Sequence, residues 1–249
     1  MNKILDPRES VISDRLKNVG KIILISGFKG GIGKSVVSVM TALSLSRKGY
    51  NVALLDLDVT SSTDDIILGA KNLYPTEDKG LIPPVFEGIK FMSFNFFSMS
   101  KPFAIRGSSV VDAIKELLCV TIWGKLDFLI VDMPPGFGDT FFEIMRLFKK
   151  FRVVSLYTPS PLSKKIVNKM IPLIKDKNIE IVKIENMSNK SGKAKLIYDP
   201  ELDKSIGNVK KLEKTLLYND VVKNLNIITG EKLWDLFLLN LLQFFYFFF

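Results

Sequence analysis

The sequence predicts a three-layer α/β/α fold around a mostly parallel central sheet. Three continuous apolar runs, at residues 21–26, 51–56 and 126–132, have the length and composition of strands that are buried on both faces. Segments with helical spacing separate these runs, and strands that alternate with helices favour a parallel sheet covered on both sides. The chain has 249 residues, which is enough for one domain of this class with a sizeable core.

The other elements follow in order along the chain. Apolar residues at helical spacing predict an amphipathic lead-in helix over 6–18 and a helix over 36–48 after the first strand. Further strands are expected at 89–93, 153–157 and 179–185, and further helices at 108–119, 140–150 and 161–175. Because no repeat or linker divides the sequence, residues 1–230 are expected to form a single domain, with 1–19 as its lead-in.

Residues 231–249 are expected to form an apolar C-terminal tail. Its last part, 236–249, reads LFLLNLLQFFYFFF and carries no charge. These 14 residues are fewer than the ~20 that a helix needs to cross a bilayer, so a transmembrane span is not predicted. Packing into the core and docking to a membrane surface or a partner both stay open.

The composition excludes several kinds of chemistry. The sequence has no histidine and a single cysteine, Cys119, which excludes Ser-His-Asp triads, His-ligated zinc and disulfides within the chain. Catalysis would have to use Lys, Asp, Ser, Asn and backbone amides. The scarcity of cysteine and the polar N-terminus favour a cytoplasmic protein, with a peripheral place at the membrane left open.

The net charge of +9 is concentrated in one segment. Residues 149–215 contain 16 Lys and Arg against 7 Asp and Glu, whereas the rest of the chain is balanced. Two interpretations follow from this surplus: a solvated lysine-rich surface, or a patch that binds the phosphates of nucleic acid or of an anionic membrane surface.

A phosphate-binding loop is the strongest chemical signal. Residues 26–35 read SGFKGGIGKS and lie between the first strand and its helix. Glycines allow the backbone amides of such a loop to face β- and γ-phosphate oxygens at the positive end of a helix. Lys34 supplies a cation for these oxygens, and the Ser35 hydroxyl can bind Mg²⁺. Phe28 replaces the first Gly of the strict Walker pattern, but the core of the motif is complete; the predicted nucleotide ligands are Lys29, Gly30, Gly31, Ile32, Gly33, Lys34 and Ser35.

The loop resembles the deviant Walker A motif of the MinD, ParA and Mrp P-loop ATPases, because a second lysine, Lys29, stands at its start. This resemblance implies an ATP-dependent homodimer in which Lys29 reaches the phosphates bound by the partner subunit. A cation that enters from the facing subunit would neutralise charge on the transferred phosphoryl group and couple hydrolysis to dimerisation. A solvated surface lysine is the alternative.

Two carboxylates end the second predicted strand, at the edge where parallel sheets bind ligands. Asp56 and Asp58 are two residues apart and are expected on one side of an extended chain. The resemblance implies that Asp58 positions or activates the attacking water, so it joins Lys29 and Lys34 as a candidate catalytic residue, and Asp56 is assigned to the Mg²⁺ shell. Asp64 and Asp65 are expected to be ordinary surface acids.

The third strand carries a Walker B carboxylate. Asp132 ends this apolar strand and is expected to hold a water of the Mg²⁺ shell, with Ser35 as the other metal-binding residue named above. The turn that follows, 134–136, predicts a switch that senses the γ-phosphate through the amide of Gly136. Asp139 could cap the next helix or touch nucleotide.

The match is strongest to the Mrp (ApbC) family. The segments that resemble it, in order, are 6–8, 16–19, 29–35, 54–58, 106–107, 123–132, 134–139 and 185–188. In this family Asn186 corresponds to an amide that binds adenine, although an Asn there could also begin a turn. The family also commonly binds an iron–sulfur cluster through a Cys-x-x-Cys pair after this element. Residues 189–200 contain no cysteine, so cluster binding by that route is excluded, and Cys119 is expected to be a small core residue.

The expected function is that of a dimeric ATPase switch with ATP and Mg²⁺ as cofactors. Hydrolysis is expected to be slow and stimulated by an unidentified protein partner, with a role in iron–sulfur cluster assembly or carriage. A positioning ATPase resembling ParA or MinD, which binds DNA or a membrane through 149–215 and 236–249, is the alternative. A third reading is an interaction module that binds ATP and barely turns it over.

Overall fold

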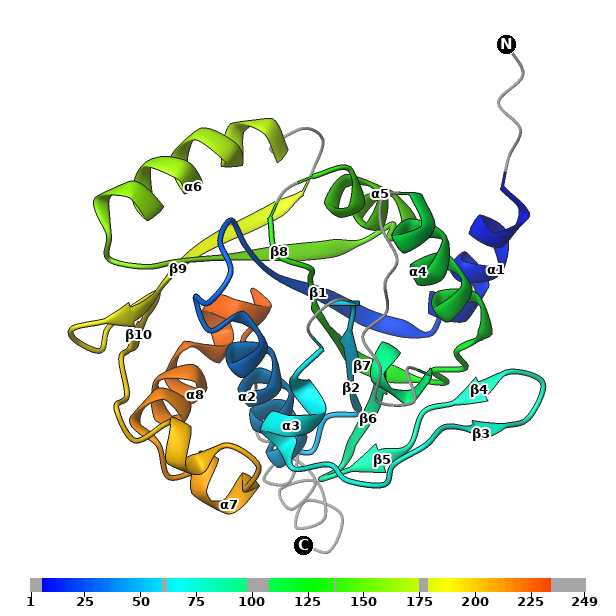
Figure 1. The fold of residues 1–249 in the computed structure, drawn as a ribbon, viewed down its shortest axis with the longest axis horizontal. Coiled ribbons are helices and arrows are strands. Elements are labelled where there is room, and N and C mark those ends of the chain that lie inside the picture. Colours follow the sequence, from blue (N-terminus) through cyan, green and yellow to red (C-terminus); the bar gives the residue numbers. More distant parts are fainter. Residues whose placement is uncertain (1–5, 60–61, 98–107, 137, 175–178, 234–249) are drawn as a thin grey trace, which may run out of the picture.

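The computed structural model describes residues 6–59, 62–97, 108–136, 138–174 and 179–233. These residues form an eight-stranded sheet with strand order β10-β9-β8-β1-β7-β2-β6-β5, together with a two-stranded sheet of β3 and β4. Helices cover both faces of the large sheet (Figure 1). The predicted three-layer fold with a mostly parallel sheet is therefore confirmed.

The strands and helices alternate along the chain. The strands are β1 (Val19–Gly27), β2 (Val52–Asp56), β3 (Thr76–Glu77), β4 (Leu81–Ile82), β5 (Val85–Phe86), β6 (Ile89–Ser93), β7 (Leu126–Asp132), β8 (Phe151–Tyr157), β9 (Glu180–Ser188) and β10 (Lys195–Ile197). The helices are α1 (Pro7–Leu16), α2 (Lys34–Arg47), α3 (Asp64–Leu68), α4 (Ser108–Val120), α5 (Asp139–Leu147), α6 (Pro161–Ile174), α7 (Val209–Leu212) and α8 (Leu216–Thr229), with short 3-10 turns at Phe94–Phe97 and Asp203–Ser205.

Parallel pairing brings the carboxyl ends of the central strands to one edge. β1 lies between β7 and β8, and β7 also pairs with β2. The register places Asp132 of β7 beside Ile25 of β1 and beside Asp56 of β2. The pairing of β5 with β6 is antiparallel. The predicted site residues on β2 and β7 are far apart in sequence. They therefore meet because these two strands are neighbours in the sheet.

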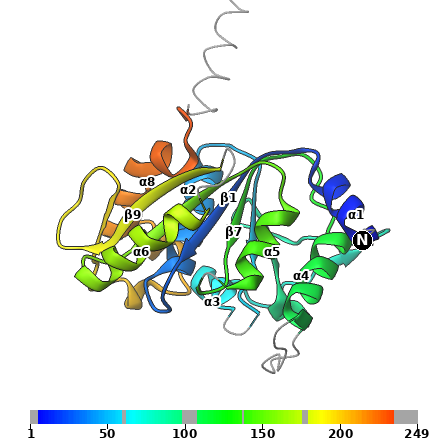
Figure 2. The same ribbon diagram turned by 90° about the horizontal axis from the view of Figure 1, so that it is seen from above.

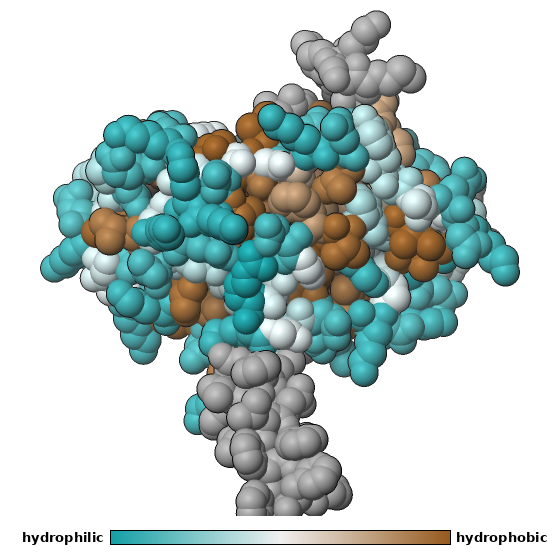
Figure 3. Space-filling view, turned by 90° about the horizontal axis from the view of Figure 1, so that it is seen from below, coloured by the Kyte–Doolittle hydropathy of each residue, from teal (hydrophilic) through white to brown (hydrophobic). Residues whose placement is uncertain are grey.

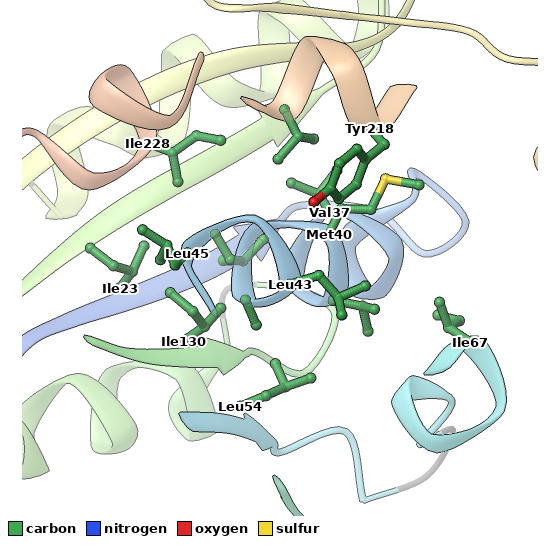
Figure 4. Close-up of a cluster of buried hydrophobic side chains, with 14 of the residues drawn as sticks. Ile23, Val37, Met40, Leu43, Leu45, Leu54, Ile67, Ile130, Tyr218 and Ile228 are labelled. Atoms are coloured by element: carbon green, nitrogen blue, oxygen red, sulfur yellow. The ribbon is translucent and has the colours of Figure 1, made fainter. Parts of the chain in front are cut away.

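Two apolar layers enclose the sheet. Successive residues of β1 alternate between them, with Ile23 packed in the layer under α2 and Leu24 in the layer under α4 and α5. Figure 2 shows the sheet between α2 with α8 on one side and α4 with α5 on the other. In Figure 4, α2 lies between the sheet and α8, which contributes Tyr218 and Ile228. Most residues of α2 are consequently buried, including its first residue, Lys34, at the end of the loop that precedes the helix.

The lead-in helix is held on the second layer by charged side chains. Asp6 caps α1 by accepting a hydrogen bond from the Arg8 amide. The Arg8 guanidinium then pairs with Asp112 and Glu116 of α4. The predicted lead-in helix therefore packs as part of the domain.

Most predicted elements are found within a few residues of their expected bounds, and several short ones were missed. The missed elements include α3, the β3–β4 hairpin, β10 and α8. The predicted apolar tail at 236–249 lies outside the described residues. In the described part of the chain, no helix is long and apolar enough to cross a bilayer. The face seen in Figure 3 is mainly hydrophilic, and its apolar side chains form separate patches.

Candidate nucleotide site

The predicted phosphate loop connects β1 to α2. Gly33 precedes the helix with φ of 77°, and Gly31 has φ of 74°. Residues that have a Cβ rarely adopt these backbone conformations. A Cβ on Gly30 or Gly31 would meet nothing within 4 Å, so the outer side of the loop is open. The loop therefore presents accessible backbone at the N-terminus of a 14-residue helix, as anion binding requires.

Lys34, Ser35 and Asp132 are in direct contact at this edge. The Lys34 Nζ lies 3.4 Å from both carboxylate oxygens of Asp132. The Ser35 hydroxyl donates a hydrogen bond to Asp132 Oδ2 over 2.7 Å, and the Ser38 hydroxyl donates to Oδ1 over 2.9 Å. Lys34 and Asp132 are both buried. The predicted phosphate ligand and two of the three predicted metal residues thus form one connected group.

Asp56 and Asp58, the two carboxylates predicted at the end of the second strand, are also buried at this edge of the sheet. β2 ends at Asp56, and the amide of Asp58 donates to Asp56 Oδ1 over 2.9 Å. The Ser62 hydroxyl donates to the other Asp56 oxygen. β2 ends before Asp58, so this residue lies in the segment that follows the strand, and its side chain is buried as that of Asp56 is. Burial and the charge of Asp132 raise the pKa of Asp56 to about 7.

The structure contradicts the expectation for Asp64. It was expected at the surface, but its side chain is fully buried at the start of α3. Its carboxylate and those of Asp56 and Asp132 lie within 4.8 Å of one another. Burial, together with the charge of Asp56, raises the pKa of Asp64 well above its usual value. The sequence TDDII gives no periodic signal that separates Asp64 from the half-buried Asp65.

Asn186 reaches the loop from β9. Its Nδ2 donates to the carbonyl oxygen of Ile32 over 2.7 Å, and a Cβ on Gly33 would lie 2.6 Å from this nitrogen. The Oδ1 is buried, and in the described residues it has no hydrogen-bond partner. Asn186 belongs to the strand and does not begin a turn, so the structure favours a role at the loop. An orphaned acceptor is suited to an amino group such as that of adenine.

Three other predicted residues have different surroundings. The Gly136 amide donates to the carbonyl oxygen of Gly27 over 3.0 Å, which places it beside the start of the loop but uses its hydrogen. Lys29 is exposed and has no partner among the residues that the structure describes. Asp139 does not occupy the capping position, because Gly138 is the N-cap of α5.

Cys119 is half-buried and packs beside the second apolar layer, so it is less enclosed than expected. Its Sγ lies 3.5 Å from the carbonyl oxygen of Arg8, to which it donates. Burial raises the pKa of this thiol. A protonated thiol at the contact of α1 and α4 is poorly suited to metal binding.

A ParA family model, described as NUBPL iron-transfer P-loop NTPase, matches residues 18–206, which is most of the chain. The chain belongs to this family. The matched part of the chain contains the loop, Asp56, Asp132 and Asn186.

Curated relatives carry a consistent name. The chain is 37% identical over 175 residues to an iron-sulfur cluster carrier protein of Rickettsia conorii, covering 70% of this chain and 55% of the relative. It is 33% identical over 210 residues to an iron-sulfur cluster carrier protein of Methanococcus maripaludis, covering 82% of this chain and 70% of the relative. The chain thus spans about half the length of the Rickettsia relative.

Solved structures share the fold. A nucleotide-binding protein of Archaeoglobus fulgidus in complex with ADP is 30% identical, with a TM-score of 0.62, and the match covers 72% of this chain and 71% of that one. The septum site-determining protein MinD of Pyrococcus horikoshii, complexed with Mg-ADP, is 18% identical, with a TM-score of 0.60 and coverage of 84% and 95%. At this lower identity the likeness concerns the fold alone.

The buried groups fit a magnesium nucleotide. A lysine, a serine hydroxyl and an aspartate in contact at a helix N-terminus supply a cation for phosphate and oxygen ligands for Mg²⁺. The unpaired Oδ1 of Asn186 supplies an acceptor next to the same loop.

Proposed function

We propose that the chain binds ATP with Mg²⁺ and hydrolyses it as a dimeric switch. The observation that carries this proposal is the connected group of Lys34, Ser35 and Asp132 beneath an open glycine loop. Bound Mg²⁺ would neutralise charge on the β- and γ-phosphates. Ser35 would exchange its hydrogen bond with Asp132 for a place at the metal, and Asp132 would hold a metal-bound water.

Lys34 would move from Asp132 to the phosphate oxygens. Its Nζ is 3.4 Å from both carboxylate oxygens, which is longer than a strong charge-assisted hydrogen bond. Asp58 is buried at the same edge and is our candidate for orienting the attacking water. Asn186 would accept a hydrogen bond from the adenine amino group.

Lys29 is our candidate for the cation supplied to the partner subunit. Its exposure, and its lack of a partner in the described residues, leave it available to a second copy of the chain. In the dimer it would stabilise charge on the transferred phosphoryl group, as an arginine finger does.

Phosphate release under steady-state conditions tests the role of Lys29. We expect Lys29→Ala to lower turnover at least about 100-fold, within the range for removal of a transition-state donor. Lys149→Ala is the matched control, because Lys149 is exposed just ahead of β8, at the opposite end of the sheet. Equal turnover in Lys29→Ala and the control would contradict the role in the partner. Absence of phosphate release from the unmodified chain, with ATP bound, would favour an interaction module.

We further propose that the switch serves iron–sulfur cluster assembly without holding a cluster on a Cys-x-x-Cys pair. The names of the curated relatives support the pathway. The sequence given has Cys119 alone, and this thiol is engaged with the Arg8 carbonyl. After anaerobic reconstitution we expect no cluster absorbance from the purified chain by itself. A stable coloured product would contradict this version.

A positioning ATPase is the second candidate, supported by α6. This helix exposes Lys164, Lys165 and Lys169 together with two large apolar side chains, Leu162 and Leu173. Such a surface suits anionic lipid or nucleic acid. Gel-shift and liposome sedimentation with ATP, for the full chain and for a chain that ends at Glu231, separate these surfaces; binding to neither would remove this candidate.

A further inference from the structure

Asp64 differs from the other two carboxylates of the buried cluster in its hydrogen bonds. Asp132 accepts from two serine hydroxyls, and Asp56 accepts from a backbone amide and a serine hydroxyl. Among the residues that the structure describes, neither oxygen of Asp64 has a hydrogen-bond partner, although its side chain is 0% exposed. An acceptor that is enclosed and unpartnered calls for a ligand.

The charges at this edge do not balance. Asp56, Asp64 and Asp132 offer oxygens within 4.8 Å of one another, and Asp58 is buried beside them. In the described part of the chain, the ammonium that pairs with this group is that of Lys34, which contacts Asp132. Removing uncompensated carboxylates from water is costly, so a cation that joins them stabilises the folded chain.

The atoms that the cluster offers as ligands indicate which kind of cation it can bind. The cluster offers carboxylate oxygens, and hydroxyl oxygens of Ser35 and Ser62 adjoin it. Hard divalent ions such as Mg²⁺ and Mn²⁺ prefer oxygen ligands, whereas soft ions prefer thiolates or imidazoles. Neither of these softer groups is among the cluster's residues.

We propose that Asp56, Asp64 and Asp132 together bind Mg²⁺ or Mn²⁺ in the absence of nucleotide. Asp64 supplies the oxygen that makes this binding independent of phosphate. The inference rests on the proposed function in one respect, because it places the cation beside the site assigned to ATP. The chain would then carry its metal before the nucleotide arrives, and the three carboxylates would release it to the phosphates as ATP enters.

Manganese titration of the full, nucleotide-free chain tests the proposal. Electron paramagnetic resonance reports free Mn²⁺, and the melting temperature with and without Mg²⁺ gives a second readout. We expect Asp64→Asn to weaken Mn²⁺ binding at least about 10-fold and to lose the stabilisation by Mg²⁺. Asp65→Asn is the matched control, because Asp65 is the next residue of α3 and accepts a hydrogen bond from the Asn95 amide outside the cluster.

Binding of Mn²⁺ by the unmodified chain and by Asp65→Asn, with loss in Asp64→Asn, supports the proposal. Absence of Mn²⁺ binding in the unmodified chain, or equal binding in Asp64→Asn, overturns it. If Asp64→Asn does not fold, Asp56→Asn replaces it with the same expected loss. A fluorescent ATP analogue, titrated with Mg²⁺ on the same preparations, separates the two claims. ATP binding without nucleotide-free Mn²⁺ binding overturns only this inference, whereas failure to bind ATP contradicts the proposed function.

Discussion

The two edges of the central sheet differ in the balance of their positive and negative side chains. At the amino edge, Arg152 of β8 pairs with Glu180 of β9 and donates to the Ile227 carbonyl oxygen near the end of α8. Lys21 of β1 pairs with Glu180 and Glu231. Positive and negative groups are equal in number in this group. At the carboxyl edge, the buried carboxylates of Asp56, Asp58, Asp64 and Asp132 lie near one buried lysine among the described residues.

This difference in charge balance indicates that the amino edge stabilises the fold and that the carboxyl edge binds ligands. Paired charges at the amino edge need no further ligand, so their effect is to fasten α8 and β9 to the sheet. A surplus of buried carboxylates lowers the stability of the ligand-free chain and is retained where a cation or a substrate restores the balance. The amino edge should therefore respond to mutation mainly in stability, and the carboxyl edge mainly in ligand binding.

The largest effect is expected from Lys34→Ala. It removes the cation that contacts Asp132 and that we assign to the phosphates. A hydrogen bond to a charged group contributes about 1.5–3 kcal/mol, so ATP affinity should fall roughly 10- to 150-fold. Titration with a fluorescent ATP analogue measures this change. Lys149→Ala should bind as the unmodified chain does, and equal affinity in Lys34→Ala would break the comparison.

Arg152→Leu should show the opposite pattern. The change removes a charged donor to the Ile227 carbonyl and the pair with Glu180. We expect the free energy of unfolding in urea to fall by about 2 kcal/mol, with ATP affinity changed less than about twofold. Arg146→Leu is a surface control, because Arg146 is more exposed than Arg152, and loss of its pairs with Glu9 and Glu143 should cost under about 1 kcal/mol. A larger loss of affinity than of stability would contradict the division of roles.

Asn186→Ala tests whether the carboxyl edge recognises the base of the nucleotide. Loss of the amide removes the contact with Ile32 and the acceptor assigned to adenine. ATP affinity should fall about 10-fold, as for one buried hydrogen bond of about 1.4 kcal/mol, while inorganic tripolyphosphate affinity should change little. Asn189→Ala, an exposed neighbour, is the control. Equal losses for both ligands would show that Asn186 supports the loop and does not read the base.

The smallest effect concerns acid stability at the amino edge. The hydrogen bond from Arg152 lowers the pKa of Glu180 below its usual 4.5. A carboxylate with a lowered pKa contributes stability above 4.5 and loses it as the pH falls through its value in the folded chain. Glu180→Gln should therefore flatten the decline of unfolding free energy below about pH 4.5. Glu77→Gln, exposed on β3, should leave the decline unchanged, and an identical decline in Glu180→Gln would contradict this assignment.

Local patterns in the sequence were sufficient for the fold and for most of the site. Buried strands such as 126–132 and the glycine loop at 26–35 are continuous in sequence, so their pattern predicts them directly. Asp132 follows from its place at the end of such a strand. Asn186 itself was assigned to adenine through family resemblance and not through pattern, and its contact with Ile32, which joins residues 154 positions apart, was not predicted.

The missed features depend on tertiary packing. Asp64 and Asp65 are adjacent acids in a five-residue helix, and only the packing of α3 decides which of them is enclosed. The hairpin of β3 and β4 uses strands of two residues, which are too short for a periodic signal. α8 was missed although its buried residues pack against α2, because the buried polar residues Asp220 and Asn224 interrupt its apolar face.

Light scattering of the purified chain measures whether ATP brings two copies together. In the proposed dimer, two copies close around two Mg²⁺-bound triphosphates, and each contributes Lys29 to the other. This arrangement predicts a mass of two chains with Mg²⁺ and a non-hydrolysable ATP analogue, and a mass of one chain with Mg²⁺ and ADP. A chain that stays monomeric with saturating analogue would contradict the account.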